Sequence, residues 1–392
     1  MLLDQDANPV RILVMIDTLA FGGAERCAVD LACGIDRRVF APHVLVTRSG
    51  GPLELVLQRH EVPYTVLGRR QRFDFRAFRA IRAAVHAADV IHAHKFGSGV
   101  WASLLSGRTP LLVHEHNWTD KFGLLDRLVY KHLVARRASA VLCVSDSVSR
   151  GVRMTGVPSR RVKPLPNAVV HKSTLGRDEA RRLLGLDTNA PLIGMIAGFR
   201  PEKAHEVAID ALADPRLASS DARLVLIGSG PSERFLRERA RERNVADRID
   251  WLGAIPDLQE HGRTLSAGAA YAAAFDVALV CSDWEGLPLF ALEAMSAGAP
   301  LVSTGVGELP SLCAEGRGWL VPPRKTAELA QAIDEVLSDP VAARARADRA
   351  QSYVVAHHSF AALTAQLERE YRSLHSDSRR HDRENAVIEG AA

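Results

Sequence analysis

The stretch from Asp276 to Pro300 reads DVALVCSDWEGLPLFALEAMSAGAP and carries three structural signals in a row. Residues 277–280 are a short apolar run, which is typical of a buried strand. A polar loop follows, and Pro288 then stands where proline suits the first turn of a helix. The glycine and the proline near the end of the stretch stop that helix. A buried strand followed by a polar loop and a helix is the repeating unit of a parallel α/β sheet.

The same alternation of short apolar runs and amphipathic segments extends over most of the chain, which predicts parallel sheets. Two prolines within 162–167 disfavour helix and indicate an extended connector between two halves. We expect α/β domains at 1–170 and 171–356, a helix at 357–374 that packs back on the first domain, and a mobile tail at 375–392. The predicted strands are 11–16, 43–47, 62–67, 89–93, 110–114 and 140–144, then 191–197, 223–228, 249–252, 276–281 and 300–303.

The composition is that of a soluble globular protein, since 47% of the 392 residues are apolar and 24% are charged. No apolar run approaches the roughly 20 residues that a transmembrane helix needs. The first ten residues lack the basic and apolar pattern of an export signal. Five scattered cysteines fit reduced thiols. We therefore expect a cytoplasmic protein.

The net charge of +4 is unevenly distributed. Residues 1–170 hold 24 Lys and Arg against 14 Asp and Glu, a balance of +10, whereas the remainder holds 26 against 32, a balance of −6. A basic first half suggests an anionic partner such as lipid headgroups, a phosphorylated acceptor or nucleic acid. Nucleic acid is disfavoured because no known binding module appears in the sequence.

Residues 69–82, RRQRFDFRAFRAIR, interleave six arginines with aromatic residues. As an interfacial helix, this segment would place its arginines beside anionic headgroups and its aromatic rings at the acyl boundary of a membrane. The alternative is an ordinary helix with its aromatic face in the core and its arginines in water. We favour that alternative because only part of the segment is strongly one-sided.

Polar residues follow two of the predicted strands of the second half. Ligands bind open α/β sheets at the carboxyl ends of the strands. The amides of Gly286 and Leu287 open a helix, whose positive end favours an anion such as a diphosphate. Arg200 and Lys203, after strand 191–197, could neutralise a leaving diphosphate. The alternative is a solvated loop with surface charges.

Two histidine pairs, His92-x-His94 and His114-x-His116, end predicted strands of the first half, and strand alternation places both members of a pair on one face. Such pairs could indicate a zinc site. No cysteine or carboxylate cluster shares their spacing, and the one Asp-x-Asp, at 4–6, lies near the terminus, so we expect no metal. The alternative for these residues is a set of hydrogen-bonded structural histidines.

Residues 285–293 fit the Glu-x7-Glu motif of the family 4 retaining glycosyltransferases, and the chain resembles this family over nearly its whole length. The implied fold is GT-B, with two facing Rossmann-like domains and a deep interdomain cleft. One departure is Ala204, because the family usually has glycine after the lysine. The other matching segments are Gly22-Gly23-Ala24-Glu25, Pro166-Asn167, Arg200 with Lys203, Leu226–Gly230, Gly307-Glu308 and the helix 360–374.

The resemblance implies roles for individual residues. Arg200 and Lys203 would hold the donor diphosphate together with the Gly286 and Leu287 amides. Glu293 would bind the ribose and Glu285 the transferred sugar. From the first domain, Gly22 and Gly23 would approach the phosphates, and His116 would lie beside the reacting sugar, or His114 if the alignment slips by two residues.

The implied reaction moves a sugar, with retention and without a metal or other cofactor, from a nucleotide-diphosphate donor to an acceptor hydroxyl. A UDP-sugar is the favoured donor, and a lipid-linked or cell-surface glycan, as in lipopolysaccharide or another polysaccharide, is the favoured acceptor. The enzyme would then work in the cytoplasm or peripherally at the inner face of the membrane. The alternatives are a sugar-nucleotide epimerase of the same fold and a non-catalytic module that binds sugar nucleotide or membrane.

Overall fold

The computed structural model describes residues 8–71, 74–117, 123–170, 175–186, 189–218, 220–260 and 263–389, without the side chains of 263 and 381–389. Asp4, Asp6, Arg72 and Phe73 therefore lie outside the described residues. The chain forms two compact units: Met1–Pro166 with Ala361–Ala392, and Asn167–Phe360. Within the described ranges, no helix combines the length and the apolarity needed to cross a bilayer.

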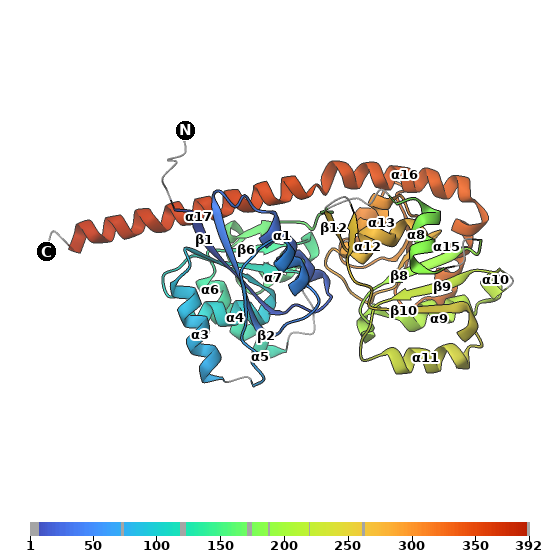
Figure 1. Ribbon diagram of the computed structural model, residues 1–392, viewed down its shortest axis with the longest axis horizontal. Helices are drawn as coiled ribbons and strands as arrows, with labels where there is room; N and C mark the ends of the chain where they lie inside the picture. The colour runs from blue at the N-terminus through green and yellow to red at the C-terminus, as the bar shows by residue number, and fades with distance from the viewer. Residues whose placement is uncertain are drawn as a thin grey trace. The chain divides into compact units, whose positions relative to one another are not determined.

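The first unit is built on a parallel sheet of seven strands in the order β3-β2-β1-β4-β5-β6-β7 (Figure 1). The order reverses between β1 and β4, which pair although β2 and β3 separate them in the chain. The predicted connector 162–167 supplies the edge strand β7, where proline is tolerated. The strands are β1 Val10–Thr18, β2 Phe40–Ser49, β3 Tyr64–Val66, β4 Val90–His94, β5 Leu111–Glu115, β6 Ala140–Cys143 and β7 Val162–Pro164.

Helices connect these strands. They are α1 Gly23–Gly34, α2 Glu54–Arg59, α3 Phe75–His86, α4 Lys95–Leu105, α5 Leu124–Val129, the π-helical turn η1 Tyr130–Val134, α6 Ala135–Arg137, α7 Asp146–Met154 and the 3-10 turn η2 Ser159–Arg161.

Helix α3 corrects the interpretation that we favoured for 69–82. The Asp74 side chain caps the helix by accepting hydrogen bonds from the backbone N–H groups of Arg76 and Ala77. Ala77, Ile81 and Val85 form the buried stripe, at the spacing of four residues that one helix face requires. Phe75 is 73% exposed and Phe78 37% exposed, so these two rings do not lie in the core.

Helix α17, Phe360–Glu389, continues 15 residues beyond the predicted end at Leu374, so 375–389 is helical. Its apolar face, which includes Leu367 and Tyr371, is buried in the first unit. The Tyr371 ring packs edge-on against Phe40, with ring centroids 5.6 Å apart. This helix therefore contributes to the core of a sheet whose strands lie far from it in the sequence.

The second unit contains a parallel sheet of six strands in the order β10-β9-β8-β13-β14-β15 (Figure 1). Its order reverses between β8 and β13. The strand β15 and the antiparallel hairpin β11-β12 were not predicted from the sequence. The strands are β8 Leu192–Ile196, β9 Arg223–Ile227, β10 Ile249–Gly253, β11 Leu258–Glu260, β12 Arg263–Leu265, β13 Val277–Val280, β14 Leu301–Thr304 and β15 Trp319–Val321.

Figure 1 shows α9 and α11 on one side of strands β8–β10, and α12 and α13 on the other. The helices of this unit are α8 Arg177–Leu184, α9 His205–Leu212, α10 Pro215–Ala218, α11 Glu233–Glu242, α12 Ala267–Tyr271, α13 Leu289–Ala297, α14 Leu309–Cys313, α15 Thr326–Ser338 and α16 Pro340–His357. Three 3-10 turns complete it: η3 Pro201–Lys203, η4 Ala246–Arg248 and η5 Ala272–Ala274.

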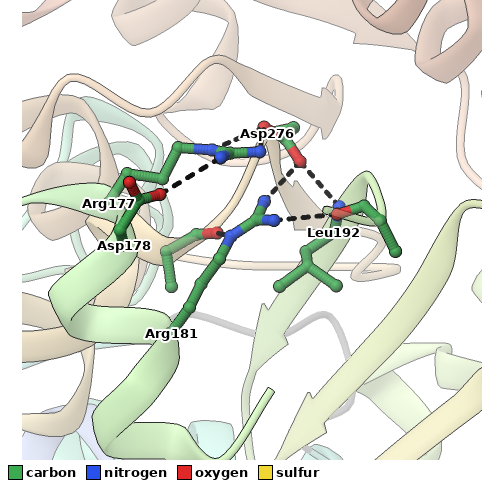
Figure 2. Close-up of polar contacts among 7 residues, drawn as sticks. Arg177, Asp178, Arg181, Leu192 and Asp276 are labelled. Atoms are coloured by element: carbon green, nitrogen blue, oxygen red, sulfur yellow. Dashed lines mark hydrogen bonds and ion pairs between the residues drawn. The ribbon is translucent and has the colours of Figure 1, made fainter. Parts of the chain in front are cut away.

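Asp276 holds the starts of β8 and β13 together (Figure 2). Its carboxylate accepts hydrogen bonds from the Leu192 amide at 2.7 Å and from Arg181 Nη2 at 2.6 Å. Arg177 Nη2 donates to the other oxygen at 2.9 Å. The Arg181 side chain is fully buried, and its remaining donors reach the carbonyls of Ala190 and Ala274, each at 2.8 Å. The network fixes the two strands whose opposite ends carry the predicted site.

Candidate active site

The predicted donor-binding residues lie where the strand order of the second sheet reverses. One loop, 197–204, follows β8 and contains Arg200 and Lys203, and the other, 281–288, follows β13 and contains Glu285. Because β8 and β13 are neighbouring parallel strands, both loops leave the same edge of the sheet. Ligands of doubly wound sheets bind at such a reversal.

The two loops are bonded directly to each other. The Asp283 amide donates to the Glu202 carbonyl at 2.9 Å. The Lys203 ammonium forms an ion pair with the Glu285 carboxylate, which also accepts from Ser282 Oγ at 2.6 Å. The Glu285 side chain is only 7% exposed, against 23% for Lys203. The structure therefore joins two predicted site residues in one partly buried charge pair.

Arg200 stands at the exposed start of the same turn, η3, in an extended backbone conformation. Among the described residues, its guanidinium has no ion-pair partner, so its charge is available to an anion. The turn ends at Ala204, whose φ of +50° and ψ of +40° are left-handed. Glycine adopts this conformation freely, whereas alanine pays about 1–2 kcal/mol. The departure from the family's glycine thus falls on a position where the backbone favours glycine.

Arg324, on the loop after β15, connects the same two loops and was missed from the sequence. Its Nε donates to Asp283 Oδ1 at 2.5 Å, and its guanidinium also pairs with Glu206 at the start of α9. The hydrogen bond to Asp283 raises the pKa of Arg324, so the clamp stays charged. No sequence motif could have indicated it, because its partners lie 41 and 118 residues away.

The loop after β14 supports the backbone of 285–286 from another side. The Glu308 amide donates to the Gly286 carbonyl at 2.9 Å. Gly307 has a φ of +58°, and a Cβ at this position would lie 2.3 Å from the Glu285 carbonyl oxygen. Thr304 Oγ1 donates to the Ser282 carbonyl at 2.7 Å. The Gly307-Glu308 pair thus has a steric role in shaping the site loop.

Helix α13 begins directly after this loop. Pro288 is its N-cap residue, and no described side chain caps its first amides. The Leu287 carbonyl accepts from Asn167 Nδ2 at 2.7 Å, which anchors the turn. A helix start of this kind presents backbone amides and a positive dipole end to an anion.

Glu293 lies further along α13, where its carboxylate contacts the start of α12. Its carboxylate accepts a hydrogen bond from Ser266 Oγ, at the start of α12. A Cβ at Gly268 would lie 1.8 Å from Glu293 Oε2, so only glycine leaves room for this carboxylate. Ser266 could have been recognised in the sequence as a helix cap, but its contact with Glu293 depends on the packing of two helices.

The residues predicted from the first half surround the reversal between β1 and β4. Gly22 caps α1, and a Cβ there would lie 2.4 Å from Glu25 Oε2. Gly23 begins that helix. Glu25 pairs with Lys95 Nζ at 2.7 Å, and Lys95 has a φ of +70°. Whether the two glycines approach a donor stays a prediction.

His116 is 5% exposed and lies within a buried histidine group. Its Nε2 is 3.0 Å from His94 Nδ1. His114, the alternative to His116, is 1% exposed and stacks on it, with ring centroids 4.4 Å apart. Burial holds the pKa of His116 well below its usual value and lowers that of His114 to about 3. Both rings are therefore neutral, and their placement beside a reacting sugar stays a prediction.

Two family models match consecutive parts of the chain. The model described as Glycosyltransferase Family 4 matches residues 21–172, and the one described as Glycosyl transferases group 1 matches residues 176–353. The curated relatives include alpha-D-kanosaminyltransferase of Streptomyces kanamyceticus, which is 28% identical over 72% of this chain and 77% of its own length. D-inositol 3-phosphate glycosyltransferase 2 of Catenulispora acidiphila is 29% identical over 84% of this chain and 78% of its own.

Solved structures agree on the fold. Anabaena Alr3699/HepE, in complex with UDP and glucose, superposes with a TM-score of 0.81 at 22% identity and covers 93% of this chain and 100% of that one. WaaG, a glycosyltransferase involved in lipopolysaccharide biosynthesis, gives 0.70 at 15% identity over 91% and 98%. With two parallel-sheet units and matching family models along both, the chain belongs to the family 4 glycosyltransferases and has the GT-B fold.

Proposed function

We propose that the enzyme transfers a sugar, with retention, from a UDP-sugar to an acceptor hydroxyl, and that the donor binds at the reversal between β8 and β13. The observation that carries the proposal is the ion pair of Lys203 with Glu285, on the same turn as Arg200, whose guanidinium has no ion-pair partner among the described residues. A cation and a carboxylate side by side suit a ligand that carries phosphates next to sugar hydroxyls. UDP is favoured because a relative of the same fold was solved with UDP and glucose.

In the proposed reaction, the bond between the anomeric carbon and the β-phosphate oxygen breaks, and a bond from that carbon to the acceptor oxygen forms. Arg200, Lys203 and the α13 amides stabilise the charge that develops on the departing diphosphate. The acceptor's proton passes to a phosphate oxygen of that leaving group. Glu285 orients the transferred sugar and Glu293 binds the ribose. Because protein cations neutralise the diphosphate in this scheme, it requires no metal or other cofactor.

For the acceptor, we propose a lipid-linked or cell-surface glycan, reached at the inner face of the membrane. Exposed Phe75 beside the arginines of α3 supports attachment to an anionic surface. The name of one relative points the same way. This relative is a mannosyltransferase of Corynebacterium glutamicum that acts on a phosphatidylinositol mannoside, 27% identical over 49% of each chain.

A panel of nucleotide sugars tests the donor proposal. The melting temperature of the full chain should rise with the true donor and with its nucleoside diphosphate, because a ligand of the native state stabilises it. UDP-sugars are expected to give the largest rise, and Lys203→Met should abolish it. A rise with no nucleotide sugar, or an equal rise in Lys203→Met, would refute the assignment. Mass spectrometry of the donor without acceptor separates transfer from epimerisation.

A further inference from the structure

Four histidines gather in the core of the first unit. His92 and His94 come from β4, and His114 and His116 from β5, and each is at most 5% exposed. The register of the two strands places His94 opposite His114. The rings stack on one another, with centroids of neighbouring rings 4.2 to 5.4 Å apart.

Hydrogen bonds occupy one nitrogen of each β4 histidine and leave the other open. Tyr371 Oη is 2.7 Å from His92 Nδ1, and His116 Nε2 is 3.0 Å from His94 Nδ1. The Nε2 atoms of His92 and His94 are buried and have no hydrogen-bond partner among the described residues. Buried polar atoms without a partner are rare in folded proteins and call for an explanation.

His114 adds a third open group between them. Neither of its ring nitrogens has a hydrogen-bond partner of good geometry within the described part of the chain, although the Leu165 backbone lies within reach of a weak hydrogen bond.

Three of these histidines each bring one ring nitrogen close to those of the other two. Ligand atoms of His92, His94 and His114 all lie within 4.8 Å of one another. With zinc–nitrogen bonds of 2.0–2.1 Å, tetrahedral geometry sets imidazole nitrogens about 3.3 Å apart. Ring rotations that move each nitrogen by roughly an ångström would therefore bring the three nitrogens to bonding distance from one ion.

We propose that His92, His94 and His114 bind one zinc-class divalent ion, through Nε2 of the first two and one ring nitrogen of the third. Tyr371 and His116 then act as positioning residues. Each accepts a hydrogen bond from Nδ1–H of a ligand, which fixes the tautomer that presents Nε2. Metal-bound histidines usually donate their second N–H in this way.

Cys27 of α1 is a candidate for the fourth position. Its Sγ lies within 4.8 Å of ligand nitrogens of His114 and His116, and it is buried. Binding as thiolate would release its proton to solvent. The sequence argument against a metal rested on the absence of such a ligand near the histidine pairs, and the fold supplies one from α1.

The ion would be structural. It would link β4 and β5. Through the hydrogen bond between His92 and Tyr371, which are 279 residues apart, it would also link the sheet to α17. Because the ion is proposed to be structural, sugar transfer without a catalytic metal stays compatible with it.

Metal content of the untagged full chain tests the proposal. Protein produced with added zinc or cobalt, so that the ion can enter during folding, should retain about one equivalent after gel filtration. The cobalt form should show the visible absorption of a four-coordinate ion. His94→Gln should lose the ion, whereas His205→Gln, which alters a buried histidine of the second unit, should retain it.

Tyr371→Phe keeps the aromatic packing and removes only the acceptor of the His92 bond. It should weaken the ion's affinity about 10- to 100-fold, as loss of a positioning partner does elsewhere. If His94→Gln fails to fold, this variant carries the test. Wild-type protein without bound ion, or Tyr371→Phe with unchanged affinity, would overturn the proposal. UDP affinity measured on the same samples reports separately on the donor site.

Discussion

The strand order reverses once in each sheet, between β1 and β4 in the first unit and between β8 and β13 in the second. Beyond β8 and β13, charged side chains stand on loops that are bonded to each other through Asp283, Glu285 and Arg324. Beyond β1 and β4 stand the glycine pair at 22–23 and one ion pair, Lys95 with Glu25.

This difference shows that one topology can place different chemistry at equivalent positions. The second unit exposes the cation Arg200 at its reversal, beside an uncapped helix start, which suits an anionic ligand. The first unit has a glycine pair at this position, and its strand-end histidines are buried and neutral. This difference supports our proposal that the donor binds in the second unit.

The largest effect should follow from removing both cations of the second reversal. Arg200→Ala with Lys203→Ala should reduce the rate of sugar transfer at least about 10³-fold, because each cation stabilises charge that appears in the transition state. Stability should fall much less than transfer, because Arg200 is exposed and lacks a described ion-pair partner, and because the Glu285 carboxylate keeps its hydrogen bond from Ser282 when Lys203 is removed. Steady-state rates measure the effect, with Arg216→Ala on α10 as the control. Near-normal transfer in the double variant would remove the proposed role.

The next effect concerns the opposite edge of the same sheet. Asp276→Ala leaves the fully buried Arg181 without its carboxylate and should lower the free energy of unfolding by about 3–5 kcal/mol. Urea denaturation measures it. Glu238→Ala, which breaks an exposed ion pair on α11, should change stability little. Equal effects of the two substitutions would show that the Asp276 network does not support the site strands.

A smaller effect, on UDP affinity, is expected at Glu293, the residue proposed to bind the ribose. Glu293→Ala should weaken UDP binding about 10- to 100-fold, which corresponds to the 1.5–3 kcal/mol of hydrogen bonds to a charged group. Calorimetric titration of the full chain with UDP measures it. Glu328→Ala, on α15, serves as the matched control. Affinity that is unchanged by Glu293→Ala would contradict the assignment of this residue.

The smallest effect per residue is expected for membrane binding by residues 69–82, the arginine-rich segment of the first unit. Replacing Arg69, Arg70, Arg72 and Arg76 with alanine should reduce flotation with anionic liposomes, at about 1 kcal/mol for each arginine near the surface. Phe75→Ser should reduce it further. The same number of arginine substitutions on α11 is the control. Flotation that does not respond would leave α3 as an ordinary surface helix.

Most strands and both site loops could be predicted from the sequence, because apolar runs and the polar residues after them are local signals. Contacts that depend on packing could not. Arg324, Ser266 and Gly268 reach the site from distant segments. In 69–82, two apolar stripes compete: the sequence drew attention to the large rings, whereas packing buries the stripe of Ala77, Ile81 and Val85. The continuation of α17 was missed because its added residues have no apolar periodicity.

Hydrogen exchange measured by mass spectrometry, on the full chain with and without UDP, tests the central claim that the nucleotide diphosphate binds at the reversal between β8 and β13. We predict slower exchange in peptides that cover 198–204 and 285–293, and loss of that protection in the Arg200→Ala, Lys203→Ala double variant. Protection confined to the first unit, or protection that persists in the double variant, would contradict the account.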